Sequence, residues 1–102
     1  MLASFSIVPI GVGKELARKV AEVISLIADS GLDYKVGAMH TTIEGEPEAV
    51  LALIMKCHNR MKELAPRVLT TITIDDRKGA KGRLTGKVKA VEKILRRKLE
   101  HE

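Results

Sequence analysis

Short stretches of alternating apolar and polar residues predict four β-strands in this chain. In the first stretch, Ala3, Phe5 and Ile7 alternate with Ser4 and Ser6, a pattern typical of a strand with one buried face. Similar patterns predict three further strands, at 34–38, 40–44 and 68–75. The second and third strands follow one another so closely in the sequence that we expect them to form a hairpin.

Apolar residues at helical spacing predict three helices. The first covers residues 14–30 and closes at Ser30-Gly31, a helix C-cap signal. The second begins at Pro47, a residue tolerated in the first helical turn, and ends at Leu64, ahead of a proline. The third follows a flexible basic loop and carries a C-terminal apolar stripe, made of Leu84, Val88, Val91, Leu95 and Leu99.

The predicted order of elements is βαββαβ followed by a helix. Two right-handed β-α-β units interleave most simply as a four-stranded antiparallel sheet with both helices on one face. The predicted fold class is therefore α+β, with a ferredoxin-like sandwich and an additional C-terminal helix. We expect residues 1–102 to form a single domain, with the basic loop and the last helix at 77–102.

The composition is that of a soluble globular protein: 45% of the residues are hydrophobic and 30% are charged. Phe5 and Tyr34 are the only aromatic residues, so we expect an aliphatic core. The single cysteine, Cys57, excludes an internal disulfide and suits a reducing cytoplasm. No apolar run approaches the roughly 20 residues of a membrane span, and the first residues lack the basic start of a secretory signal. We therefore expect a cytoplasmic protein that does not bind membranes.

Parity along the strands predicts a polar sheet face. If the helices cover one face, the alternating apolar residues point towards them: Phe5, Ile7, Ile43, Ile72 and Ile74. The opposite face then carries small hydroxyls and carboxylates: Ser4, Ser6, His40, Thr42, Glu44, Thr71, Thr73 and Asp75. These residues could simply be solvated. Solvated strands usually carry more long charged side chains, however, so we favour a face that meets a ligand or a second sheet.

No catalytic or metal site stands out in the sequence. Cys57 and His58 are adjacent, and adjacent residues on a helix point about 100° apart, so they do not form a nucleophile–base pair. Cys57 also continues the apolar stripe, which favours a buried structural thiol. His40, His58 and His101 lack metal-ligand spacing. We therefore expect no enzyme activity, no metal and no cofactor. A small enzyme with Asp75 or His58 as general base is the last-ranked alternative.

The basic C-terminal segment raises nucleic-acid binding as an alternative. Ten Lys and Arg residues and three Glu residues lie in 77–102, which gives this segment a net charge of +7 and leaves −2 for residues 1–76. RNA-binding domains of ferredoxin-like fold stack bases on aromatic side chains of the sheet. Here Phe5 is assigned to the core, so a solvated helix face is the favoured interpretation.

Several short motifs, in order along nearly the whole chain, resemble those of a known family. They are Phe5-Ser6-Ile7-Val8-Pro9 with Gly11, Ser30-Gly31-Leu32-Asp33-Tyr34, Met39-x-Thr41-x-Ile43-Glu44-Gly45, Lys56-Cys57-His58 and Ile72-x-Ile74-Asp75-Asp76-Arg77. Together they resemble the small thiamine-binding protein family. The resemblance implies a ferredoxin-like fold, dimers or tetramers that assemble through their sheets, and binding of thiamine or its hydroxymethylpyrimidine part without conversion.

These observations lead to one predicted function and one predicted site. We expect a homo-oligomer, associated through the sheet face, that binds a thiamine-like small molecule reversibly. An aminopyrimidine presents a ring nitrogen beside an amine, which hydroxyls and carboxylates can match, and a cationic thiazolium favours nearby carboxylates. The predicted ligand-binding residues are Ser6, Thr42, Glu44, Thr73 and Asp75.

Overall fold

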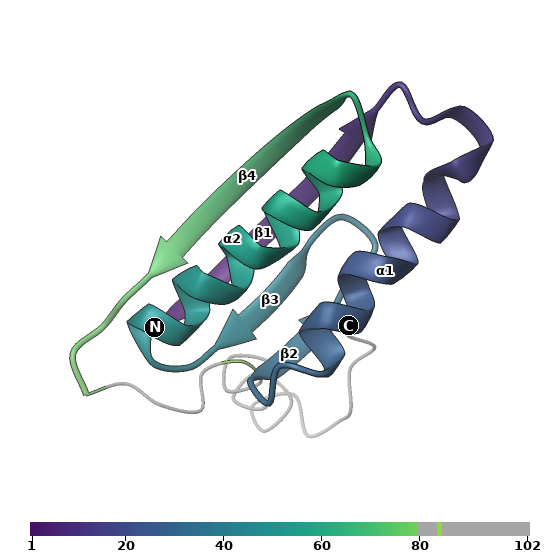
Figure 1. The fold of residues 1–102 in the computed structure, drawn as a ribbon. Helices are drawn as coiled ribbons and strands as arrows, with labels where there is room; N and C mark the ends of the chain where they lie inside the picture. Colours follow the sequence, from purple (N-terminus) through teal and green to yellow (C-terminus); the bar gives the residue numbers. More distant parts are fainter. Residues whose placement is uncertain (80–83, 85–102) are drawn as a thin grey trace, which may run out of the picture.

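The computed structural model describes residues 1–79 and Leu84, and shows a four-stranded sheet with two helices on one face (Figure 1). Its strands are β1 (Leu2–Ile10), β2 (Asp33–Val36), β3 (Thr41–Glu44) and β4 (Arg67–Asp75). A 3-10 turn (Gly13–Glu15) precedes α1 (Leu16–Ala28), and α2 is Pro47–Leu64. The predicted ferredoxin-like α+β fold is confirmed. The predicted C-terminal helix lies outside the described residues, apart from Leu84.

The sheet is antiparallel throughout, with the strand order β2-β3-β1-β4. The central strand β1 pairs with β4 along its whole length, from Leu2 opposite Asp75 to Ile10 opposite Arg67. It pairs with the much shorter β3 only from Leu2 to Phe5. Among the described residues, the strand lengths therefore leave half of β1 without a paired strand on the β3 side.

The core is aliphatic, as predicted, and lies between the sheet and the two helices. Its buried side chains come from four elements: Ala3, Phe5, Val23, Ile27, Ile43, Val50, Leu53, Ile54, Cys57 and Met61. The strand parity predicted for Phe5 and Ile43 is confirmed, because both are buried beneath the helices. Ile72 and Ile74 occupy the same sheet face by register, yet they remain 40% and 46% exposed. In Figure 1, α2 lies over β1, whereas β4 runs alongside α2 at the edge of the sheet.

Local signals explain where most elements begin and end. At the end of α1, the Ser30 hydroxyl donates to the Ile27 carbonyl at 2.7 Å and accepts from the Leu32 amide. Gly31 then adopts a φ of +82°, which favours glycine. Pro47 begins α2, and the extended backbone of Ala65, just before Pro66, ends it.

The connection between β2 and β3 differs from the prediction. β2 ends at Val36, and the Gly37 amide donates to the His40 carbonyl at 2.8 Å, so residues 37–40 form a turn. The expected strand segments at 37–38 and at His40 are therefore wrong. The chain must reverse direction between two antiparallel strands, and it does so within these four residues, where alternation alone suggested a strand.

Candidate ligand-binding site

The five predicted binding residues lie on the sheet face opposite the helices. Residues directly paired across a sheet share a face, and successive residues of a strand alternate between faces. Because Phe5 on β1 and Ile43 on β3 face the helices, the residues next to each of them along its strand face the opposite side of the sheet. In this register Ser4 lies between Thr42 and Thr73, Leu2 lies between Glu44 and Asp75, and Ser6 pairs with Thr71. We call Ser6, Thr42, Glu44, Thr73 and Asp75 the open-face patch.

The open-face patch is extended. Ser6 and Leu2 are four residues apart on β1, so Ser6 lies roughly 14 Å from the row that holds Glu44 and Asp75. The Leu84 amide donates to Glu44 Oε1 at 3.3 Å, and Leu84 also lines a hollow of about 100 Å³ beside Thr42. Glu44 thus contacts Leu84, and Thr42 lies beside the hollow that Leu84 lines, whereas Ser6 lies apart from both.

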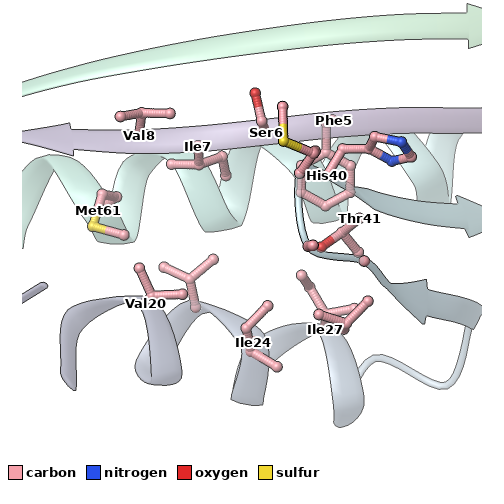
Figure 2. Close-up of a pocket in the computed structure, with 15 residues that line it drawn as sticks. Phe5, Ser6, Ile7, Val8, Val20, Ile24, Ile27, His40, Thr41 and Met61 are labelled. Atoms are coloured by element: carbon pink, nitrogen blue, oxygen red, sulfur yellow. The ribbon is translucent and has the colours of Figure 1, made fainter. Parts of the chain in front are cut away.

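A larger cavity lies on the other side of the sheet, between β1 and α1. It has a volume of about 230 Å³ and an apolar wall formed by α1 residues, including Val20, Ile24 and Ile27. Figure 2 shows these three side chains directed from α1 towards β1, with the loop that holds His40 at one end. This combination of apolar walls and few polar groups is typical of small-molecule sites.

The cavity borders the part of β1 that β3 does not reach. β3 begins at Thr41, which pairs with Phe5, and no strand in the described residues pairs with Ser6–Ile10 on that side. Alternate residues of an antiparallel strand direct both N–H and C=O towards the same side. Ser6, Ile7 and Val8 of this edge line the cavity, so backbone groups directed to the β3 side lie beside it. We call the free edge at Ser6–Ile10 the β1 notch.

Three polar residues contribute to the cavity beside the β1 notch. Thr41 is the one buried polar side chain among the described residues, at 7% exposure, and its hydroxyl can donate or accept a hydrogen bond. His40 is exposed and lines both this cavity and the hollow beside Thr42. The Ser6 hydroxyl points away from α1 in Figure 2, so Ser6 borders the cavity through its backbone.

Sequence reasoning missed the cavity because its residues looked like core. Val20, Ile24 and Ile27 belong to an ordinary amphipathic helix stripe, and Thr41 falls within a predicted strand. One signal could have revealed the β1 notch: the third predicted strand is about half as long as the first. A short strand beside a long one leaves part of the long strand's edge unpaired.

Cys57 and His58 do not form a catalytic pair. The buried Cys57 thiol points towards α1, 3.9 Å from the Val23 carbonyl, whereas His58 Nδ1 is hydrogen-bonded to the Thr70 hydroxyl at 2.6 Å on the β4 side. Burial raises the pKa of the Cys57 thiol to about 11. The prediction that Cys57 is a buried thiol within the core is confirmed.

This burial predicts slow thiol chemistry. At pH 8 the folded chain should hold roughly a hundredfold less thiolate than an unfolded one, because burial disfavours the charged form of the thiol. Reaction with Ellman's reagent at pH 8 should therefore be at least that much slower in buffer than in denaturant. Equal rates in the two conditions would contradict the burial of Cys57.

Neither metal ligation nor membrane insertion has structural support in the described part of the chain. Residues 1–79 hold no group of three His, Cys, Asp or Glu side chains placed to bind a metal ion. No helix within the same residues has both the length and the hydropathy needed to cross a bilayer.

Comparison with known proteins identifies the family. The family model of thiamine-binding proteins matches residues 3–92. The UPF0045 protein Mb1933 of Mycobacterium bovis is 39% identical over 98 residues, which cover 95% of this chain and 96% of that protein. The UPF0045 protein sll0230 of Synechocystis is 31% identical, over 93% of this chain and 79% of that protein.

Two solved structures share the fold over most of their length. The hypothetical protein MJ1052 of Methanocaldococcus jannaschii superposes with a TM-score of 0.78 at 28% identity, covering 88% of this chain and 93% of that one. A Thermotoga maritima protein, provisionally named for thiamine biosynthesis or salvage, has a TM-score of 0.77 at 26% identity, covering 88% and 96%. The chain therefore belongs to the thiamine-binding protein family.

Proposed function

We propose that this protein binds thiamine or its hydroxymethylpyrimidine part reversibly, with the pyrimidine ring in the cavity at the β1 notch. Membership of the family and the provisional thiamine name of the Thermotoga maritima structure support the class of ligand. The observation that carries the position is the free edge of β1 beside a cavity with apolar walls.

The chemistry of the β1 notch complements an aminopyrimidine. Such a ring presents an acceptor nitrogen next to a donor amine, and a free strand edge presents backbone N–H and C=O groups side by side. The apolar faces of the ring would pack against Val20 and Ile24, and the hydroxyl of Thr41 offers one further partner. A volume of about 230 Å³ suits one ring better than a complete two-ring ligand. The thiazolium would then lie outside, towards His40.

The open-face patch is the alternative position for the same ligand. Its carboxylates, Glu44 and Asp75, flank Leu2 on one face, and two nearby negative charges favour a cationic ring. Substitutions on the two sides of the sheet distinguish these positions, as set out in the Discussion. Both positions predict the same ligand and the same absence of conversion.

We further propose that the protein catalyses nothing and that its sheet face takes part in self-association. The unreactive position of Cys57 supports the first statement. The exposed pair Val8 and Leu69, opposite one another on the open face, supports the second. The nucleic-acid alternative depends on the basic segment at 77–102, of which residues 77–79 and Leu84 lie within the described part of the chain.

Isothermal titration calorimetry with thiamine and with hydroxymethylpyrimidine, at two salt concentrations, tests the proposal. We expect saturable binding of both ligands with micromolar Kd and one site per chain. Salt should change the affinity little, since the ring is held by hydrogen bonds and apolar contacts. Affinity that falls steeply with salt would instead indicate binding through phosphate contacts. No heat with either ligand would contradict the proposed function.

A further inference from the structure

A second hollow lies where α2 is connected to β4, at the end of the molecule opposite to the N-terminus (Figure 1). It has a volume of about 240 Å³ and is lined by His58, Lys62, Ala65, Pro66, Arg67 and Val68. Every ionisable side chain in this lining is basic, and no carboxylate of the described residues belongs to it. We call these six residues the basic hollow.

The fold holds two basic side chains on the α2 side of this hollow. His58 and Lys62 are four positions apart on α2, so they lie on the same face of the helix. The His58 ring is fixed in orientation, because its Nδ1 is hydrogen-bonded to the Thr70 hydroxyl at 2.6 Å. Since His58 lines the hollow, Nε2 is the ring nitrogen that remains available to a ligand there.

The third basic side chain is placed by a tightly packed connection. Arg67 begins β4 opposite Ile10 of β1. The residue before it, Pro66, has a restricted φ and packs closely on the backbone of Gly11, where an added Cβ would lie only 3.0 Å from Pro66 Cγ. Gly11 and Pro66 thus fix the connection from α2 to β4, so the position of Arg67 is set by the fold.

The positive charge of the basic hollow is not neutralised by nearby carboxylates. Neither Lys62 nor Arg67 forms an ion pair with a described residue. The carboxylates of α1 and of the second half of α2 are engaged elsewhere, because Glu22 and Glu63 each contact Arg60 at 2.7 Å. The hollow therefore keeps its charge available for an anion.

The carboxylates of β3 and β4 lie at the other end of the sheet. Glu44 and Asp75 flank Leu2 in the register, whereas Arg67 lies opposite Ile10. The length of β1 from Leu2 to Ile10 separates these two ends by roughly 27 Å. Exposed charges are largely screened beyond about 8 Å at physiological ionic strength, so these carboxylates do not compensate the basic hollow.

We propose that the basic hollow binds a phosphate group, either as the free ion or as part of a phosphomonoester. Arg67 can direct two N–H groups at two oxygens, Lys62 adds a compact charge, and His58 offers a further donor. Donors from three side chains suit a tetrahedral group with several free oxygens better than a planar carboxylate. The hollow lies on the β4 side of α2, whereas the β1 notch faces α1, so the proposal does not depend on thiamine binding.

Calorimetric titrations at constant ionic strength test the proposal. Inorganic phosphate or glycerol phosphate should show saturable binding with a roughly millimolar Kd, because the hollow is open to solvent, and sodium chloride should show none. Tighter binding of glycerol phosphate would identify a phosphomonoester as the ligand, and tighter binding of inorganic phosphate would identify the free ion. The absence of saturable binding with both probes would overturn the proposal.

Substitutions that remove one charge locate the site. Lys62→Gln and Arg67→Gln should each weaken phosphate binding about fivefold or more, since each removes a charged donor. Lys56→Gln removes the same charge from a different face of α2 and should leave the Kd unchanged. Equal weakening by Lys56→Gln would show a general effect of net charge and would overturn the site.

A structural role of Lys62 gives a different result. Lys62 lies in the last turn of α2, where a cation also stabilises the helix dipole. If this were its whole role, Lys62→Gln would lower the Tm equally with and without phosphate and leave the Kd unchanged, which would contradict the proposal. A phosphate site instead predicts that phosphate raises the Tm of the original chain more than that of Lys62→Gln.

NMR signals of the imidazole rings place the anion independently. At constant pH, inorganic phosphate should shift the ring signals of His58 with the Kd found by calorimetry. The ring of His40, at the β1 notch, is the matched control and should keep its signals in place. Larger shifts at His40 than at His58 would place the anion elsewhere and refute the assignment.

Discussion

Replacing Met61 by alanine is expected to lower the free energy of unfolding by about 2–5 kcal/mol. Met61 lies on α2, is 1% exposed and belongs to the core between the helices and the sheet. Truncation therefore removes buried contacts and leaves a cavity that the neighbouring side chains cannot fully fill. Small domains are stabilised by only about 5–15 kcal/mol, so this loss should be plain in urea denaturation and in the Tm.

Met39 offers a matched control for this substitution. Its side chain is 84% exposed in the turn between β2 and β3, so Met39→Ala should change the free energy of unfolding by less than about 0.5 kcal/mol. Both variants remove the same atoms, and only burial differs between them. Similar effects at the two positions would contradict the packing of α2 on the sheet.

Replacing Ile24 by tryptophan should abolish thiamine binding, or weaken it at least tenfold. Ile24 is half-buried on α1 and lines the cavity beside the β1 notch, so a larger side chain would occupy the space proposed for the pyrimidine ring. Because the position is partly open to solvent, we expect the fold to accommodate the change. Calorimetric titration gives the affinity, and the Tm reports the integrity of the fold.

Two further variants make this result specific. Ser25→Trp adds the same side chain to the exposed surface of α1, about 100° around the helix, and should leave the affinity unchanged. Glu44→Ala removes a carboxylate from the open-face patch and should change the affinity less than twofold if the ring lies at the β1 notch. The opposite outcome, in which Glu44→Ala weakens thiamine binding and Ile24→Trp leaves the affinity unchanged, would place the ligand at the open-face patch.

The two faces of the sheet thus have different proposed roles. The helix side holds the cavity, because the short β3 pairs only with Leu2–Phe5 and no other described strand covers the rest of that edge of β1 beside α1. The open face carries the hydroxyls and carboxylates that the alternation pattern indicated.

The local pattern was sufficient for the fold. The signals used were short-range: alternation in β1 and β4, the apolar stripe of α2, and the start and stop residues Pro47, Gly31 and Pro66. The structure has the corresponding strands, helix and helix ends at the expected places. Strand parity also assigned Phe5 and Ile43 correctly to the buried face, because the side-chain period of a strand is two wherever the strand lies. The alternation failed only at residues 37–40, where a turn replaced a strand.

The position of the candidate site required the tertiary structure. Sequence parity can assign Ser6, Thr42 and Glu44 to one face, but it cannot give the distances between them, which depend on register across separate strands. The β1 notch likewise arises from a difference in length between two strands that are neighbours only after folding. The exposure of Ile72 and Ile74 depends on how far α2 extends across the sheet. The sequence alone determined the elements and their buried faces, since these follow from local geometry, whereas the cavity and the free edges arise from long-range packing that only the tertiary structure decided.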